Sequence, residues 1–132
     1  MGSHKAGWDV VERMAKEGRV KTRYKMMAHW QSSIVTLHPS NDEVKELLIE
    51  NKDKESDIAK LDGLKILVDG VPASRTSLHK EPFLDKPESH GVQNLPTEDL
   101  TKALVEYDKL GVTVQMHVVG AIATDYPVSE PV

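Results

Sequence analysis

Two residues, Lys65 and His117, could carry chemistry because each interrupts an apolar run of strand length. Lys65 lies within residues 64–68, where an isolated ammonium is costly to bury. Either this strand lies at the edge of a sheet, with the amine reaching water, or Lys65 points into a polar site. His117 lies near the carboxyl end of residues 112–119, and a lone histidine on an apolar strand is usually a hydrogen-bonded core residue. Four other histidines occupy polar or loop contexts without the spacing of a helical metal motif: His29, His38, His79 and His90.

The segment after the first of these strands is polar. Asp69 and Gly70 end the apolar run, and Ser74, Arg75 and Thr76 follow. In α/β proteins the reacting groups lie just past the carboxyl ends of the strands. Ser74, Arg75 and Thr76 could therefore hold an anionic part of a substrate, or they could be loop residues that cap a turn.

The composition excludes several classes of protein. The chain has 132 residues, of which 39% are hydrophobic and 29% charged, as expected for one globular domain. It contains no cysteine, so disulfides and thiolate metal sites are excluded, and a cytoplasmic location is expected. No apolar run approaches the roughly 20 residues of a membrane span, so no membrane partner is expected. Alternating basic residues in 19–25 are typical of a solvated strand face, and no nucleic-acid partner is expected.

Hydrophobic periodicity predicts helices and strands that alternate along the chain. In order they are a helix over residues 5–17, a half-exposed strand over 20–28, a helix that begins at Ser40 or Asn41, a strand over 64–68 buried on both faces, a helix capped by Thr97, and a strand over 112–119. Residues 32–37 could form a strand or a loop, and residues 58–61 one more helical turn. This alternation predicts an α/β fold with a parallel sheet.

The domain boundaries follow from composition. Residues 1–4 are typical of a cloning remnant, residues 5–124 form one α/β domain, and residues 125–132 are a tail with two prolines. Within the domain, residues 69–96 show no periodicity. Loops of that length are often functional.

Two segments resemble the metal-dependent amidohydrolase superfamily, in the branch of exoenzyme-like and N-substituted formamide deformylase-like members. Residues 64–76 read LKILVDGVPASRT, similar to that branch's strand lysine followed by Asp-Gly and then Ser-Arg-Thr. Residues 110–120 read LGVTVQMHVVG, similar to its strand histidine followed by Gly-Asp. The resemblance covers residues 61–124, whereas residues 6–57 match only in their pattern of elements.

This resemblance implies a site and a reaction. The family fold is a (β/α)8 barrel with one or two divalent, zinc-like metals at the carboxyl ends of its strands. Lys65 occupies the place of the carboxylated lysine that bridges the metals, and His117 the place of a histidine ligand. The resemblance therefore implies hydrolysis of amide-type C–N bonds by metal-activated water.

Three departures from the family pattern predict that the isolated chain is inactive. The early His-x-His pair is absent, Ala121 replaces the aspartate after Gly120, and a full barrel needs about 250 residues. The chain would then be a fragment with about three to four strands of a barrel, and its metal site would need missing parts or a second copy. Alternatively, it is a stand-alone, non-catalytic binding or assembly module. A homo-oligomer is expected in either case, because an open piece of barrel exposes strand edges.

Overall fold

The computed structural model describes the chain except for residues 1, 4, 31–39, 53, 55 and 126–132. Helices and strands alternate along the described part. In chain order they are β1 (Gly2–Ser3), α1 (Lys5–Lys16), β2 (Tyr24–Trp30), α2 (Asn41–Asn51), β3 (Ala59–Leu67), η1 (Pro72–Ser74), α3 (Thr97–Lys109), β4 (Thr113–His117) and α4 (Ala121–Asp125). None of the described helices is long and apolar enough to cross a membrane.

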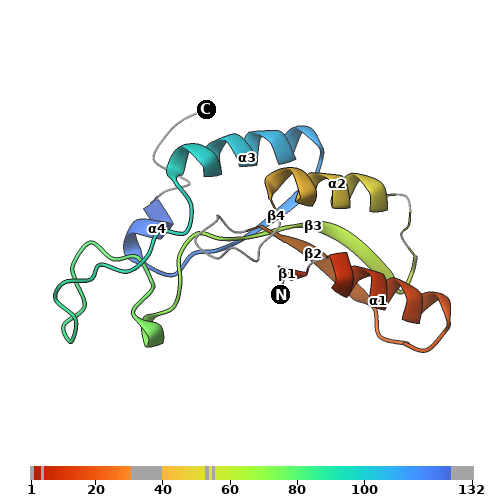
Figure 1. Ribbon diagram of the computed structural model, residues 1–132, viewed down its shortest axis with the longest axis horizontal. Helices are drawn as coiled ribbons and strands as arrows, with labels where there is room; N and C mark the ends of the chain where they lie inside the picture. Colours follow the sequence, from red (N-terminus) through yellow and green to blue (C-terminus); the bar gives the residue numbers. More distant parts are fainter. Residues whose placement is uncertain (1, 4, 31–39, 53, 55, 126–132) are drawn as a thin grey trace.

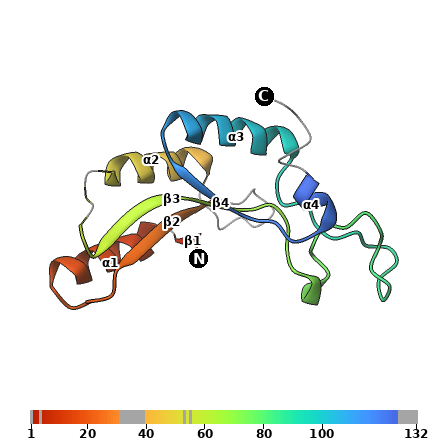
Figure 2. The same cartoon turned by 180° about the vertical axis from the view of Figure 1, so that it is seen from behind.

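The strands form one parallel sheet in the spatial order β1-β2-β3-β4. Parallel neighbours need a crossover connection, and α1, α2 and α3 each follow one strand and precede the next. Helices α2 and α3 lie side by side over the sheet, and the long segment after β3 extends away from them (Figures 1 and 2). The predicted α/β fold, a partial barrel-like parallel sheet with flanking helices, is thereby confirmed.

The hydrophobic core lies between these helices and one face of the sheet. Its buried side chains include Trp8, Ala28, Val44, Leu48, Leu64, Ile66, Val68, Leu100, Ala103 and Tyr107. One buried polar pair joins α1 to α2: Trp8 Nε1 donates to Asn51 Oδ1 at 2.8 Å, and Asn51 Nδ2 donates to the Leu47 carbonyl at 2.7 Å. Both polar groups are therefore satisfied, as burial demands.

Helix α2 begins at a capping box. The Ser40 hydroxyl accepts from the Glu43 amide at 3.2 Å, and the Glu43 carboxylate accepts from the Ser40 amide at 2.7 Å. The hydrogen bonds that the Glu43 carboxylate accepts from the Ser40 amide and hydroxyl lower the pKa of Glu43. Of the two residues predicted to start this helix, Ser40 is the cap. The predicted cap of α3 is wrong by one position, because Pro96 is its N-cap and Thr97 its first residue.

Two predicted strand boundaries are also wrong. Strand β2 begins at Tyr24 rather than at residue 20, and it extends to Trp30. The segment predicted as a helical turn over 58–61 instead opens β3 at Ala59. The cause is a bulge: Met26 pairs with Leu61 and Met27 with Gly63, so Asp62 is an extra residue that breaks the alternation of β3. Residues 32–37 lie outside the described part.

The environment predicted for residues 64–68 is corrected in two ways. Strand β3 lies between β2 and β4, so the interpretation of Lys65 as an edge residue is wrong. Burial on both faces is wrong as well, because Lys65 and Leu67 remain partly exposed while Leu64 and Ile66 are fully buried. Gly2 and Ser3 pair with Met27 and Ala28 as the short strand β1.

Candidate functional site

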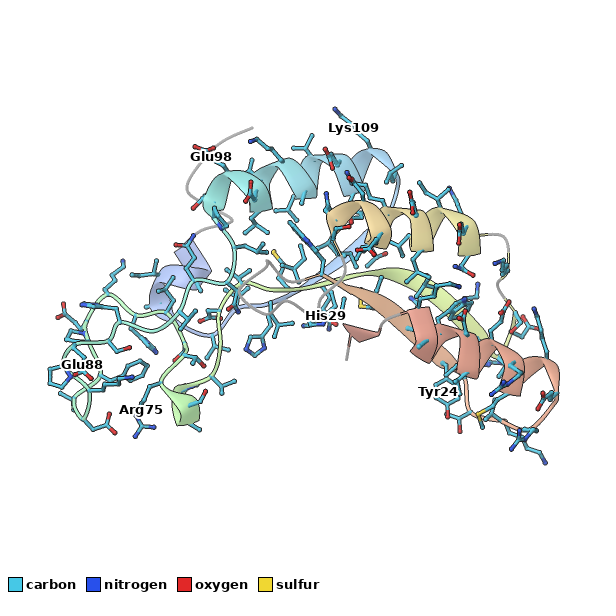
Figure 3. The ribbon with its side chains drawn as sticks, in the orientation of Figure 1. Tyr24, His29, Arg75, Glu88, Glu98 and Lys109 are labelled. Atoms are coloured by element: carbon cyan, nitrogen blue, oxygen red, sulfur yellow. The ribbon has the colours of Figure 1, made fainter. Side chains whose placement is uncertain are left out.

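The open face of the sheet is the face opposite α1, α2 and α3, and it carries the candidate site. His29, Lys65 and Gln115 are paired in register across β2, β3 and β4, so their side chains form one row on this face. Leu67 and His117 form the next row toward the carboxyl ends. Figure 3 shows His29 on the side of the sheet away from α2 and α3. Since paired residues on adjacent strands lie about 4.8 Å apart, the row places His29 and Gln115 on either side of Lys65.

Lys65 and His117, the two predicted metal ligands, therefore share one face of adjacent strands. They are not directly paired, because His117 is in register with Leu67, two residues beyond Lys65. Both side chains are partly buried. This diagonal separation is within reach of a long lysine and an imidazole.

His117 is held by the turn that follows β3. Its Nε2 lies 3.0 Å from the carbonyl oxygen of Gly70. A carbonyl can only accept, so Nε2 carries a proton, and in the neutral imidazole the lone pair is then on Nδ1. Nδ1 is thus the imidazole atom that could bind a metal or accept a proton.

Asp69 is fully buried and has a structural role at the carboxyl end of β3. Its carboxylate accepts hydrogen bonds from the backbone amides of Leu78 at 3.0 Å, Val119 at 3.0 Å and Gly120 at 2.7 Å. Hydrogen bonds to an ionised acceptor are stronger than those between neutral groups. Asp69 thereby joins the ends of β3 and β4 to the long segment 69–96, and so fixes the turn that holds His117.

The predicted anion-binding residues lie in a tight turn past the end of β3. Ser74 Oγ and Thr76 Oγ1 are 2.8 Å apart, and Thr76 Oγ1 also accepts from the Val71 amide at 3.0 Å. Gly70 is needed there, because an added Cβ would collide with the Thr76 side chain. The two hydroxyl groups therefore stabilise the loop.

The Arg75 side chain folds back on that turn, because its Nη1 donates to the Ala73 carbonyl at 2.9 Å. Arg75 has a left-handed backbone (φ 59°) and forms a two-pronged ion pair with Asp85, with its Nε 2.9 Å from both carboxylate oxygens. The guanidinium lowers the pKa of Asp85, and the carboxylate raises the pKa of Arg75. An anionic ligand would have to compete with Asp85, so anion binding by Ser74, Arg75 and Thr76 stays a prediction.

His29 is the residue of the open face that the sequence interpretation missed. The predicted strand ended at residue 28, which left His29 in a loop, whereas β2 continues to Trp30. The available signal was the alternation itself, since Ala28 and Trp30 are buried and His29 between them is not. Extending the alternation by two residues places His29 on the open face of β2.

The described residues do not form a metal site by themselves. They contain no group of three or more histidine, aspartate or glutamate residues that could hold a metal ion. Lys65 and His117 supply two ligand atoms, fewer than the three or four protein ligands of a typical zinc site. A metal on the open face would need at least one further ligand beside Lys65 and His117.

Two curated proteins are similar to about half of this chain. No family model matches the chain. Over 60 residues it is 37% identical to the putative amidohydrolase YtcJ of Bacillus subtilis (strain 168), which covers 46% of this chain. Over 65 residues it is 32% identical to the protein LONG AFTER FAR-RED 3 of Arabidopsis thaliana, which covers 49% of this chain. Each match spans only 11% of the relative's length.

Solved structures match almost the whole chain. Uncharacterized metal-dependent hydrolases from Pyrococcus furiosus and Pyrococcus horikoshii OT3 superpose with TM-scores of 0.76 and 0.75, at 22% and 19% identity. Each covers 98% of this chain, which in turn spans 25% of each hydrolase chain. At these low identities the superpositions establish a common fold alone. The chain corresponds to about a quarter of each hydrolase chain.

Proposed function

We propose that the chain contributes part of the active site of a metal-dependent hydrolase acting on amide-type C–N bonds, in the exoenzyme-like and formamide deformylase-like branch, and that it is inactive alone. The observation that carries the proposal is the placement of Lys65 and His117 on the same open face of adjacent parallel strands. Carboxyl ends of parallel strands are the usual place for active-site residues in barrel folds. The similarity to metal-dependent hydrolases over 98% of the chain supports the same assignment.

Each residue has a separate task in this proposal. The Lys65 side chain, carboxylated on its amine, and His117 Nδ1 would be two ligands of a divalent, zinc-like metal, and further ligands would be needed beside these two. The Gly70 carbonyl oxygen lies 3.0 Å from His117 Nε2 and fixes the tautomer of this histidine. Asp69 holds the Gly70 turn through its three backbone hydrogen bonds. Loss of any one of these contacts would displace a ligand atom.

Zinc binding by the purified chain tests the assignment. Zinc is expected to bind weakly and to shift the NMR signals of Lys65 and His117, because two ligands are too few for a tight site. Lys65→Met and His117→Ala should each weaken this binding, whereas His90→Ala, which removes an exposed histidine of the loop, should not. Equal zinc affinity in all four proteins would contradict the proposed ligands.

Activity tests the second half of the proposal. The isolated chain, supplied with zinc and a panel of amides and cyclic amides, should show no turnover above that of the Lys65→Met variant. Turnover that requires both Lys65 and His117 would show that the chain is an enzyme without further segments.

A non-catalytic assembly module is the second candidate. The observation that favours it is the lack of a three-ligand group among the described residues. Strand β4 is also paired on one side only within the described sheet, and an unpaired strand edge promotes association. We expect a homo-oligomer, measured by native mass spectrometry with metal content determined on the same sample. A metal-free oligomer would favour the assembly module, and a monomer at micromolar concentration would contradict it.

A further inference from the structure

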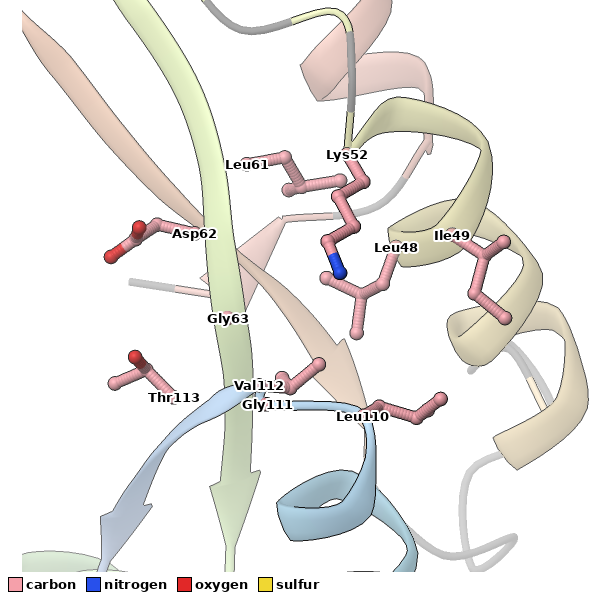
Figure 4. A pocket seen from close by; sticks show the side chains of 10 residues that line it. All are labelled: Leu48, Ile49, Lys52, Leu61, Asp62, Gly63, Leu110, Gly111, Val112 and Thr113. Carbon is pink, nitrogen blue, oxygen red and sulfur yellow. The ribbon is translucent and has the colours of Figure 1, made fainter.

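A pocket of about 150 Å³ lies on the helix-covered side of the sheet, where α2, β3 and the start of β4 meet (Figure 4). It is separate from the open face that carries Lys65. Its walls include Leu48, Ile49, Lys52, Leu61, Leu110 and Val112.

The walls of this pocket are apolar at its base and at its rim. Leu48 and Leu61 are buried, at 6% and 4% exposure, and form the base. Ile49 and Leu110 are 58% and 39% exposed and stand at the rim. Apolar cavities of about 150 Å³ bind molecules of the size of benzene. A ligand of about six carbons would therefore fill the space and cover two exposed apolar side chains.

Lys52 gives the pocket a charge. Asp62 also lines the pocket, but Figure 4 shows its carboxylate on the other side of β3 from the Lys52 ammonium. Asp62 is bound there to Lys25, with Nζ and Oδ2 2.6 Å apart. Lys52 is exposed, and within the described part of the chain it forms no ion pair.

The end of α2 determines where that anion would lie. Lys52 is the C-cap of α2, whose last carbonyls carry a partial negative charge. A carboxylate is therefore unfavourable near those carbonyls and favourable further out, beside the exposed ammonium. This orients a ligand with its apolar part inward and its acid group at the rim.

We propose that this pocket binds small amphipathic carboxylates with an apolar body of about six carbons, such as hexanoate or benzoate. Apolar contact with Leu48, Leu61 and Val112 supplies the affinity, and Lys52 supplies the preference for an acid. The inference is independent of the proposed hydrolase function, because none of these residues lies on the open face.

A matched ligand series separates the two contributions. Hexanoate, hexanol and hexylamine share one tail and differ in charge, and their binding is followed by NMR chemical-shift changes at Ile49, Leu61 and Val112. Hexanoate is expected to bind tightest and hexylamine weakest. The difference should shrink in high salt, because exposed charges are screened.

Variants assign the head and the tail to their residues. Lys52→Met should weaken hexanoate about two- to fivefold, the range for one exposed ion pair, and leave hexanol unchanged. Ile49→Ser should weaken all three ligands. Lys54→Met is the matched control, because it removes an exposed lysine two residues away that does not line the pocket.

Three results would overturn the inference. One is the lack of saturable shifts at the pocket residues with hexanoate. Another is binding of hexylamine as tight as that of hexanoate. The third is a preference for hexanoate that Lys52→Met retains.

Discussion

The same strands build two faces of the sheet that differ sharply in what they carry. On the covered face Ala28, Leu64 and Ile66 are completely buried under the helices. On the open face His29 and Lys65 occupy the alternate positions of the same strands and stay partly exposed. Strands with one solvated face normally alternate in this way, whereas parallel sheets are normally covered on both faces. The polar row therefore marks the face that the described chain leaves without a cover.

Two polar residues of the same segment, Asp69 and Lys65, also differ in their burial and in their hydrogen-bond partners. Asp69 is fully buried, and three backbone amides surround its carboxylate. Lys65 remains partly exposed on an interior strand. Breaking a buried, fully bonded polar network is costly, whereas an exposed charge usually contributes little to stability. We thus expect substitutions of the two residues to have very different effects.

The largest expected effect is the loss of a covered-face side chain. Leu64→Ala should lower the free energy of unfolding by about 3 kcal/mol, because it removes a fully buried side chain and leaves a cavity. Leu67→Ala, three positions along the same strand and partly exposed, should lower it by about 1 kcal/mol or less. Urea unfolding at one pH measures both. Equal losses would mean that the open face is covered in solution, for example by another copy of the chain.

Substitution of Asp69 is expected to cause the next largest loss in the free energy of unfolding. Asp69→Asn should lower the free energy of unfolding by about 2 kcal/mol, because the new amide group donates where a backbone amide also donates. The same variant should increase amide hydrogen exchange at Leu78, Val119 and Gly120, the three donors of the native carboxylate. Exchange unchanged at these positions would show that Asp69 does not hold the strand ends together.

The sequence predicts the covered face better than the open one. The alternation of elements, the Ser40 cap and the buried stripes follow from local periodicity and turn chemistry, which depend on neighbours a few residues away. The bulge at Asp62 depends on pairing with β2, and it concealed the start of β3. Whether Lys65 lies at an edge depends on which strands pair, and this cannot be read from the strand itself.

The site shows the same division between local and distant information. Lys65 and His117 could be predicted because each interrupts an apolar strand. The role of Asp69 could not, because its partners Val119 and Gly120 are about fifty residues further along the chain. The position of His29 beside Lys65 likewise depends on register between two strands.

Tyr107 links helices α2 and α3 and makes a smaller, pH-dependent contribution to the stability of the fold. Its hydroxyl donates to Asn41 Oδ1 at 2.7 Å, which joins α3 to α2. Burial raises the pKa of Tyr107 above that of an unfolded tyrosine, so above about pH 10 the unfolded chain loses a proton that the folded chain keeps. Stability should therefore fall as the pH rises beyond 10.

Tyr107→Phe checks this origin of the alkaline loss. At neutral pH the variant should be less stable by about 1 kcal/mol, the value of one hydrogen bond. Above pH 10 its stability should fall less steeply than that of the native chain. Parallel pH profiles for the two proteins would show that Tyr107 does not cause the loss.

Substitution of Lys65 is expected to change the free energy of unfolding least, and it tests the role of the open face most directly. Lys65→Met keeps the length of the side chain and removes its charge, so the free energy of unfolding should change by no more than about 1 kcal/mol in either direction. The comparison with Leu64→Ala, one position away on the same strand, controls for the location. A large loss at Lys65 would mean that its ammonium stabilises the fold, and the case for a functional lysine would weaken. A small change, together with weaker zinc binding, would mean that the chain keeps Lys65 for a ligand on the open face.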